Sequence, residues 1–171
     1  MTVRLERPED RDTSIEVERL AFEGPLEASI VEEVRDLDGS FALVAEEDGA
    51  VVGHVQFSRA WVGEMPVVAL GPIGVRPDRQ GHGIGTALVA EGLEEARRRD
   101  EPAAILLGSP EFYGRRGFVP AARFGLRNPF AGVIEDDFVI AEEDFQVAVL
   151  ADPVPVFGGE VRWHPSFGEV G

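Results

Sequence analysis

The sequence predicts an α/β or α+β domain built on a mixed β-sheet that helices flank. Three observations carry this prediction: two apolar strands enclose an amphipathic helix, a turn signal joins two earlier strands, and short strand patterns recur toward the C-terminus. The chain has 171 residues, of which 44% are hydrophobic, so it can form a core. We therefore expect one domain over residues 1–171, because no repeat or linker divides the chain.

The N-terminal residues predict one strand and two helices. Apolar and charged residues alternate over residues 3–6, which indicates a short strand that ends before Pro8. Apolar residues then recur at helical spacing over residues 15–21 and 26–37, and Gly39 follows the second run as a helix stop. Two helices are therefore expected before the next strand.

A β-hairpin is predicted after these helices. Residues 41–46 and 51–57 are rich in apolar residues, and the dipeptide Asp48-Gly49 lies between them. Asp-Gly favours the positive φ angles of a two-residue hairpin turn, so the two runs are expected to pair as antiparallel strands.

The strongest element pattern is a βαβ unit in the middle of the chain. Residues 67–75 and 103–107 are nearly all apolar or small, as expected for strands buried on both faces. The helix between them carries an apolar stripe of Gly85, Leu88, Val89, Gly92, Leu93 and Ala96. Two glycines and a proline within residues 71–74 are poor strand formers, so we expect a bulge or a break in strand pairing there. Further short strands are predicted at residues 118–119, 139–140, 147–150 and 161–163.

The connection between the first buried strand and this helix carries the chemistry of the sequence. Residues 76–86 read RPDRQGHGIGT, with three glycines at alternate positions. Glycines let the backbone turn tightly and let a ligand approach it, and the first N–H groups of a helix have no acceptor within the helix. The helix dipole adds partial positive charge, so an anion such as a pyrophosphate fits this loop. The chain has no lysine, so backbone amides would do most of the binding.

Two common phosphate-binding patterns do not fit this loop. The pattern G-x-G-x-x-G would need a glycine in place of Thr86, and no Gly-Lys-Ser/Thr occurs in the chain. Gln80, Gly83 and Gly85 instead match Gln/Arg-x-x-Gly-x-Gly/Ala. This match resembles the acetyl-CoA motif of the GCN5-related N-acetyltransferase (GNAT) superfamily.

The resemblance extends to both sides of the loop. Ile73-Gly74-Val75 is similar to the end of the family's fourth strand, and Val75-x-Pro77 to the start of its loop. Residues 113–118, YGRRGF, resemble the family's Tyr-x-x-x-Gly-Phe after the fifth strand, and residues 107–113 resemble the YhbS-type acetyltransferases of the superfamily. The matches lie in order over about residues 41–120, the expected acetyl-CoA-binding core. The resemblance thus implies a GNAT-type mixed sheet that is splayed at its centre.

The resemblance also implies which residues hold acetyl-CoA. Backbone groups of Ile73 and Val75, on either side of Gly74, would hold the pantetheine arm and polarise the thioester carbonyl. Amides of Gly81, His82, Gly83, Ile84, Gly85 and Thr86 are expected to hold the pyrophosphate, and Gln80 is a further cofactor-binding residue of the motif. Arg76 or Arg79 would reach the outer phosphates.

Acetyl transfer to an amine requires one proton to leave the ammonium group and one to reach the CoA thiolate. By resemblance Tyr113 is the general acid, and a phenol with a pKa of about 10 is protonated at neutral pH. The base is left open among Glu64, Glu111, His54 and a water chain, because the fourth strand carries no glutamate. His54 and His164 otherwise fit structural roles, and no His, Asp or Glu spacing indicates a metal site.

Charge and composition narrow the expected partners. Thirty-two acidic residues oppose sixteen arginines, and the net charge of −16 disfavours a nucleic-acid partner. No apolar run is long enough to cross a membrane, the first residues lack a secretory pattern, and cysteine is absent. We therefore expect a cytoplasmic protein that does not bind membranes, whose acidity fits GC-rich coding or adaptation to high salt.

These features together predict an N-acetyltransferase. It would move an acetyl group from acetyl-CoA to a primary amine of a small molecule or protein by direct attack in a ternary complex, without a metal. Two alternatives stay open, namely a non-catalytic acyl-CoA-binding module and an acyltransferase with another acyl donor or a hydroxyl acceptor. Trp61 and Phe130 are candidates for the wall of an apolar acceptor pocket, with core packing as the alternative. A homodimer is compatible with the resemblance.

Overall fold

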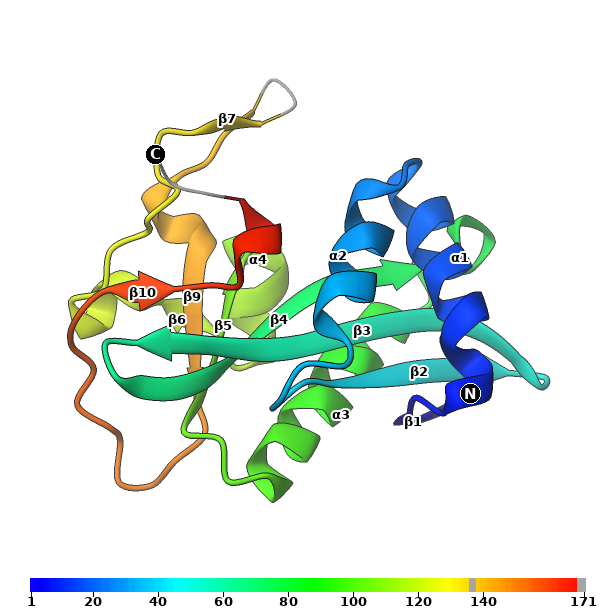
Figure 1. The fold of residues 1–171 in the computed structure, drawn as a ribbon, viewed down its shortest axis with the longest axis horizontal. Coiled ribbons are helices and arrows are strands. Elements are labelled where there is room, and N and C mark those ends of the chain that lie inside the picture. Colours follow the sequence, from blue (N-terminus) through cyan, green and yellow to red (C-terminus); the bar gives the residue numbers. More distant parts are fainter. Residues whose placement is uncertain (136–137, 169–171) are drawn as a thin grey trace. The chain divides into compact units, whose positions relative to one another are not determined.

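The structure, a computed structural model, describes residues 1–135 and 138–168, and Figure 1 shows its course. The chain divides into two compact units, of which unit 1 comprises residues 1–59 and 70–95, and unit 2 comprises residues 60–69 and 96–171. The expectation of one domain over the whole chain stays a prediction. None of the helices described is long and apolar enough to cross a membrane.

Unit 1 contains the predicted N-terminal strand, two helices and hairpin. Its elements are β1 (Thr2–Leu5), α1 (Arg11–Phe22), α2 (Leu26–Val34), β2 (Phe41–Glu47), most of β3 (Ala50–Val62), the end of β4 (Met65–Val75) and most of α3 (Ile84–Arg98). β1 pairs with β2 and β2 with β3, both antiparallel. Asp48 and Gly49 have φ angles of 49° and 79°, so the predicted hairpin turn is confirmed. β3 continues beyond Phe57 because Ser58 and Ala60 stay buried.

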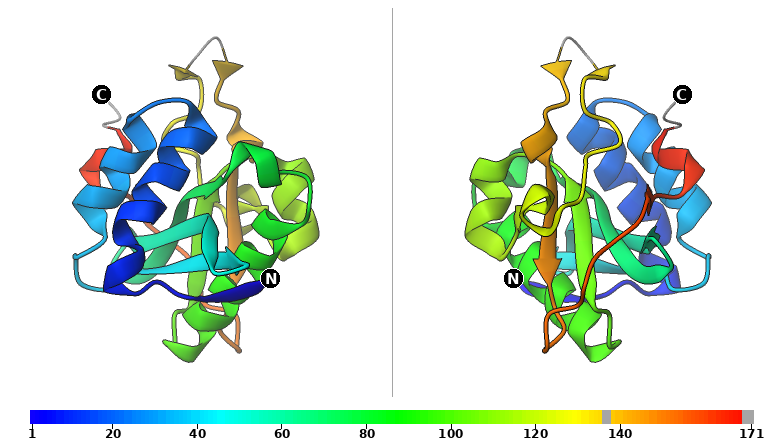
Figure 2. Two further views of the ribbon diagram at one scale, coloured as in Figure 1. Left: turned by 90° about the vertical axis from the view of Figure 1, so that its right-hand side faces the viewer. Right: turned by 90° about the vertical axis from the view of Figure 1, so that its left-hand side faces the viewer.

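Helices cover both faces of the unit 1 strands (Figure 2). Gly53 of β3 faces α3, because a Cβ there would lie 2.8 Å from Ile84 Cγ2. The next residue, His54, contacts Glu18 of α1 at 2.6 Å. Successive strand residues point to opposite faces, so α1 and α3 lie on opposite sides of β3. The predicted stripe of α3 is confirmed, with Leu88, Val89, Leu93 and Ala96 buried.

The first two helices differ from the expectation at their ends. α1 begins earlier, at Arg11, because a 3-10 turn over Pro8–Asp10 leads directly into it. α2 ends at Val34, where the chain tightens and the Leu37 amide donates to the Val34 carbonyl at 3.1 Å. Leu26 and Leu37, which the apolar periodicity placed on one helical face, are 59% and 44% exposed. The residues that α2 buries are Ala28, Val31 and Val34.

Unit 2 contains strands of a mixed sheet, a separate antiparallel pair formed by Ile134–Glu135 and Phe138–Val139, and a short α-helix. Its elements, besides the β3–β4 hairpin tip, are β5 (Ala103–Leu107), α4 (Pro110–Tyr113), β6 (Val119–Pro120), β7 (Ile134–Glu135), β8 (Phe138–Val139), β9 (Phe145–Val149) and β10 (Val161–Arg162). β4 and β5 are parallel, β9 is antiparallel to β5 and β6, and β10 pairs with the end of β3. The predicted mixed fold class is confirmed, and the short strands lie within one or two residues of their predicted positions. α4 is an addition, because only a turn was expected after β5.

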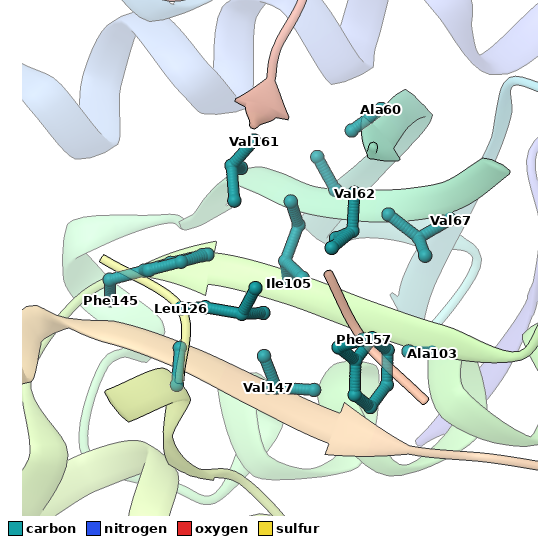
Figure 3. Packing of buried hydrophobic residues seen from close by; sticks show 12 residues of the cluster. Ala60, Val62, Val67, Ala103, Ile105, Leu126, Phe145, Val147, Phe157 and Val161 are labelled. Atoms are coloured by element: carbon teal, nitrogen blue, oxygen red, sulfur yellow. The ribbon is translucent and has the colours of Figure 1, made fainter. Parts of the chain in front are cut away.

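The core of unit 2 is an apolar cluster between these strands and the following loops (Figure 3). Its members are Ala60, Val62, Val67, Ala69, Ala103, Ile105, Ala121, Leu126, Phe145, Val147, Phe157 and Val161. The β4–β5 ladder pairs Val68 with Ala104 and Ala69 with Ile105, and β4 then continues to Val75. The ladder thus ends before the glycine- and proline-containing end of β4, where the sequence predicts a break in pairing.

Candidate functional site

The connection between β4 and α3 lies on the surface of unit 1. Residues 77–83 are exposed, and a 3-10 turn over Pro77–Arg79 leads to the first loop glycines. Gly81 and Gly83 have φ angles of 77° and 81°, a region that favours glycine. A Cβ at either position would meet no atom within 4 Å. The backbone at these two residues is therefore open to close approach by a ligand.

The first turn of α3 follows directly after these glycines. Ile84 anchors it through a buried side chain, and the Ala87 amide makes an early helical bond to the Gly83 carbonyl at 3.1 Å. The amides of Ile84 and Gly85 precede any acceptor within the helix, and the exposed Thr86 lies in the same turn. Amides at this point, with the positive end of the helix dipole, suit an anionic group.

Two loop side chains contact nearby backbone carbonyls, one at the end of β4 and one within the loop. Gln80 Nε2 donates to the Val75 carbonyl at 3.0 Å, which ties the loop to the last residue of β4. His82 Nδ1 lies 3.1 Å from the Arg79 carbonyl. Both were predicted as cofactor-binding residues, and in this structure their visible contacts shape the loop that would bind the ligand.

Two arginines border the loop, each with a carboxylate partner. Arg76 makes two hydrogen bonds to Asp78, at 3.0 and 2.8 Å, and this contact lowers the pKa of Asp78. Arg79 Nε lies 3.5 Å from a Glu47 carboxylate oxygen. Either guanidinium can exchange its carboxylate for a phosphate, so the geometry does not select one of them.

The end of β4 brings together the three predicted strand residues. Ile73 and Val75 are half-buried, whereas Gly74 is buried. A Cβ at Gly74 would lie 2.7 Å from Oε2 of Glu18 in α1. Gly74 must therefore lack a side chain, because α1 occupies the space beside it.

Tyr113 ends α4 in unit 2 and is held by aromatic packing. Its ring meets Phe112 and Phe118 edge-on, with centroids 4.8 and 5.7 Å away. A Cβ at Gly108 would lie 2.5 Å from Tyr113 Cε2, so the ring occupies the side-chain space of that glycine. Burial raises the pKa of Tyr113 to about 12, against an opposing effect of the Arg116 charge. The phenol is therefore protonated at neutral pH and able to donate a proton.

The candidate bases lie in different surroundings. Glu64, in the β3–β4 turn, and Glu111, on α4, are exposed. His54 is fully buried, with Nδ1 hydrogen-bonded to Glu18 Oε1 at 2.6 Å. An imidazole without solvent exposure does not meet an incoming amine directly, so His54 fits the structural role.

Glu18 is a residue that the sequence reasoning missed. It is fully buried in α1, on one helical face with Ser14, Val17 and Ala21. Burial raises its pKa, and the His54 contact opposes that shift. A carboxylate at helical spacing between apolar or small residues was the available signal, since such a position is otherwise apolar.

Unit 2 also contains a cavity of about 410 Å³ that both predicted acceptor-pocket residues line. Its lining consists of Trp61, Pro129, Phe130, Glu160, Val161, Arg162, Trp163, Pro165 and Gly168. The guanidinium carbon of Arg162 lies 5.3 Å from the centroid of the Trp61 ring. Within the described ranges, no three His, Cys, Asp or Glu side chains form a group able to hold a metal ion.

Known proteins match this chain in sequence and in fold. The profile of the Acetyltransferase (GNAT) family matches residues 11–118. The uncharacterized N-acetyltransferase YhbS of Escherichia coli (strain K12) is 35% identical over 173 residues, which cover 98% of each chain. The crystal structure of E. coli YhbS in complex with CoA has a TM-score of 0.84 at 34% identity, covering 99% of this chain and 93% of that one. A GNAT family acetyltransferase from Brucella melitensis, in complex with acetyl-CoA, has a TM-score of 0.73 at 30% identity, covering 98% and 97%.

Proposed function

Because this chain belongs to the GNAT family of acetyltransferases, we propose that it acetylates a primary amine of a small molecule or protein, using acetyl-CoA in a ternary complex. The observation that carries this proposal is the open backbone at Gly81 and Gly83, immediately before the N-terminus of α3. Two structures of matching fold with CoA or acetyl-CoA bound support the same ligand here.

The β4–α3 loop binds the pyrophosphate of acetyl-CoA in this proposal. Backbone amides hold the two phosphates, and Thr86 adds its hydroxyl from the first turn of α3. The residues involved are Gln80, Gly81, His82, Gly83, Ile84, Gly85 and Thr86. Gln80 acts by keeping the loop on Val75, as its 3.0 Å hydrogen bond suggests. Arg76 or Arg79 exchanges its carboxylate partner for an outer phosphate.

The end of β4 binds the pantetheine arm. Backbone groups of Ile73 and Val75 make hydrogen bonds to the arm and polarise the thioester carbonyl, whose oxygen becomes negative as the amine attacks. Gly74 carries no side chain, so α1 packs directly against the strand from one face.

The transfer forms a C–N bond and breaks the C–S bond. The amine nitrogen attacks the thioester carbonyl and loses one proton, and the CoA thiolate leaves with one proton from the Tyr113 phenol. The phenol takes a proton back from solvent, so the proton count balances. The phenol has a pKa of about 12 and so stays protonated at neutral pH, and its hydroxyl donates to the sulfur as the C–S bond breaks and negative charge develops there.

Deprotonation of the acceptor uses water or an amine that is already neutral. His54 has no solvent exposure, and no glutamate lies on β4. A dedicated base is therefore not part of this proposal, and the rate should rise with pH as the acceptor amine loses its proton.

Three measurements test the proposal. Calorimetric titration with CoA should show binding, and hydrogen exchange should show protection at residues 80–86. Thiol release from acetyl-CoA should depend on an added primary amine from a panel. Absence of heat and of protection would overturn the binding site. Binding without thiol release would favour the non-catalytic module, and faster release with longer acyl groups or with hydroxyl compounds would favour another acyltransferase.

A further inference from the structure

A buried carboxylate–imidazole pair lies beside the end of β4 in unit 1. The side chains of Glu18 and His54 are fully buried, and Oε1 of the glutamate lies 2.6 Å from Nδ1 of the histidine. Among the residues described, His54 Nε2 has no hydrogen-bond partner. The Gly74 backbone acts on the Glu18 carboxylate as a hydrogen-bond donor that lowers its pKa, so this carboxylate faces β4.

The Glu18 carboxylate lies against the backbone of β4. Oε2 of Glu18 lies 2.7 Å, and its Cδ 3.1 Å, from the position that a Cβ of Gly74 would take. The Cβ of Ala21, one helical turn further along α1, lies 3.1 Å from the same point. No positive φ angle requires a glycine at this position, so Gly74 is needed because α1 fills the space.

A second charged pair holds the histidine from its other side. His54 Nε2 lies 3.7 Å from Oε1 of Glu6, and the same oxygen accepts a hydrogen bond from Arg35 Nη2 at 2.9 Å. The Glu6 and Arg35 side chains are 7% and 10% exposed. Residues after β1, in α1, after α2 and in β3 are thus joined in one polar cluster, which fixes α1 against the strands.

We propose that Glu18 and His54 are positioning residues for acetyl-CoA binding. His54 holds the Glu18 carboxylate against Gly74, and this contact sets the backbone of Ile73 and Val75, which binds the pantetheine arm. The inference rests on the proposed function. The pair touches neither the substrate nor the reacting atoms and acts only through this backbone. Because the same backbone groups polarise the thioester carbonyl, loss of the pair should weaken acetyl-CoA binding and also lower kcat.

The first test is Gly74→Ala, with Gly92→Ala as its matched control. The new methyl group would lie 2.7 Å from Glu18 Oε2 in the first variant and 2.5 Å from the Phe57 ring in the second. We expect Gly74→Ala to weaken CoA binding and to raise KM for acetyl-CoA by about tenfold, together with a decrease in kcat. Gly92→Ala should lower only Tm, because its clash lies between α3 and β3. Equal losses of CoA affinity in both variants would overturn the inference.

The second test uses Glu18, so that the outcome does not depend on the folding of Gly74→Ala. Glu18→Gln keeps the shape and a hydrogen bond to His54 and should bind CoA within about twofold of the unmodified chain, whereas Glu18→Ala should bind about fivefold more weakly. In the double variant, Glu18→Ala removes the side chain that obstructs the new methyl group of Gly74→Ala. Its loss of CoA affinity should therefore be smaller than the product of the losses in the two single variants. The inference would be overturned if Glu18→Ala bound CoA with wild-type affinity, or if the loss of affinity in the double variant equalled the product of the two single losses.

These tests separate the inference from the proposed function. If the unmodified chain does not bind CoA in calorimetry, the proposed function fails. If it binds CoA and the Glu18 and Gly74 variants bind equally well, only the positioning role fails.

Discussion

Two regions of the molecule depend on glycine for different physical reasons. In unit 1, Gly81 and Gly83 have positive φ angles and empty surroundings, so glycine is needed for the path of the backbone. In unit 2, Gly108 has no positive φ angle, and glycine is needed because the Tyr113 ring occupies the position of its Cβ. Gly81 and Gly83 thus keep a stretch of backbone open to a ligand, whereas Gly108 leaves room for the ring of Tyr113.

This difference separates the expected consequences of mutation. A loop that binds through amides tolerates changes of side chain but not of backbone conformation, so its variants should lose affinity. A phenol that acts through one oxygen depends on the placement of a single ring, so variants around it should lose rate. Three predictions test this separation, and a fourth compares the buried groups Glu18 and Tyr113.

The largest effect is expected for Gly83→Val. A β-branched residue is strongly disfavoured at a φ of 81°, so the loop must change its path and withdraw its amides from the pyrophosphate. We expect CoA affinity to fall by about a hundredfold or more, measured by calorimetry. Gly49→Val is the matched control, because Gly49 has a φ of 79° and also no neighbour within 4 Å. It should lower Tm and leave CoA affinity unchanged, and an equal loss in both variants would refute the binding role of the loop.

A smaller and different effect is expected for Tyr113→Phe. The variant keeps the ring that packs on Phe118 and removes only the hydroxyl. We expect kcat to fall by about a hundredfold, with KM for acetyl-CoA unchanged, in steady-state thiol-release kinetics. Because the pKa of Tyr113 is raised to about 12, tyrosine ionisation should not reduce kcat of the unmodified enzyme below about pH 10. An undiminished kcat in the variant would remove Tyr113 from the mechanism.

Gly108→Ala should affect the same step less strongly. Its methyl group would lie 2.5 Å from Tyr113 Cε2, so the ring must move by a few tenths of an ångström or more. We expect a loss of about tenfold in kcat, and little further loss when Tyr113→Phe is already present, because both changes act through one hydroxyl. Gly114→Ala is the control, since a Cβ there meets nothing within 4 Å and the φ angle of −60° suits alanine. A decrease in CoA affinity with unchanged kcat would contradict the assignment.

The same contrast explains how much the sequence could predict. The loop was predictable because its determinants are local: three glycines, a buried strand before them and an apolar helical stripe after them. The contact between Glu18 and His54 joins residues 36 positions apart, and no local pattern places one beside the other. Local periodicity also placed Leu37 on an apolar face that the chain leaves after Val34, where a tighter turn closed by the Leu37–Val34 hydrogen bond ends the helix.

The surroundings of Tyr113 were predictable in part, less so than the loop and more so than the contact between Glu18 and His54. The motif located the residue after β5, but not the helix α4 or the packing of the ring on Gly108, which follows from side-chain shapes. The sequence could not identify a general base, because β4 carries no glutamate. The candidate His54 is buried in the structure and is hydrogen-bonded to Glu18 of α1.

The smallest effect expected is a difference in stability that depends on pH. Burial raises the pKa of Glu18 above its ordinary value of 4.5, so the folded state favours the protonated carboxyl. The stability that this group contributes is fully present below about pH 4.5 and is lost as the pH rises through the folded-state pKa. The glutamine in Glu18→Gln carries no charge. The Tm of this variant minus the Tm of the unmodified chain should therefore increase by a few degrees as the pH rises from about 4 toward neutral.

Tyr113→Phe provides the counterpart from unit 2. The folded-state pKa of about 12 exceeds the ordinary value of 10.0, so the stability contributed by the phenol is present below pH 10 and is lost as the pH rises toward 12. The Tm difference between Tyr113→Phe and the unmodified chain should therefore stay constant from acidic to neutral pH, where the Glu18→Gln difference changes. Thermal unfolding of both variants over one pH series makes the comparison. A constant difference for Glu18→Gln would show that the carboxylate ionises as readily in the folded chain as in the unfolded one, because the hydrogen bonds from His54 and the Gly74 backbone offset its burial.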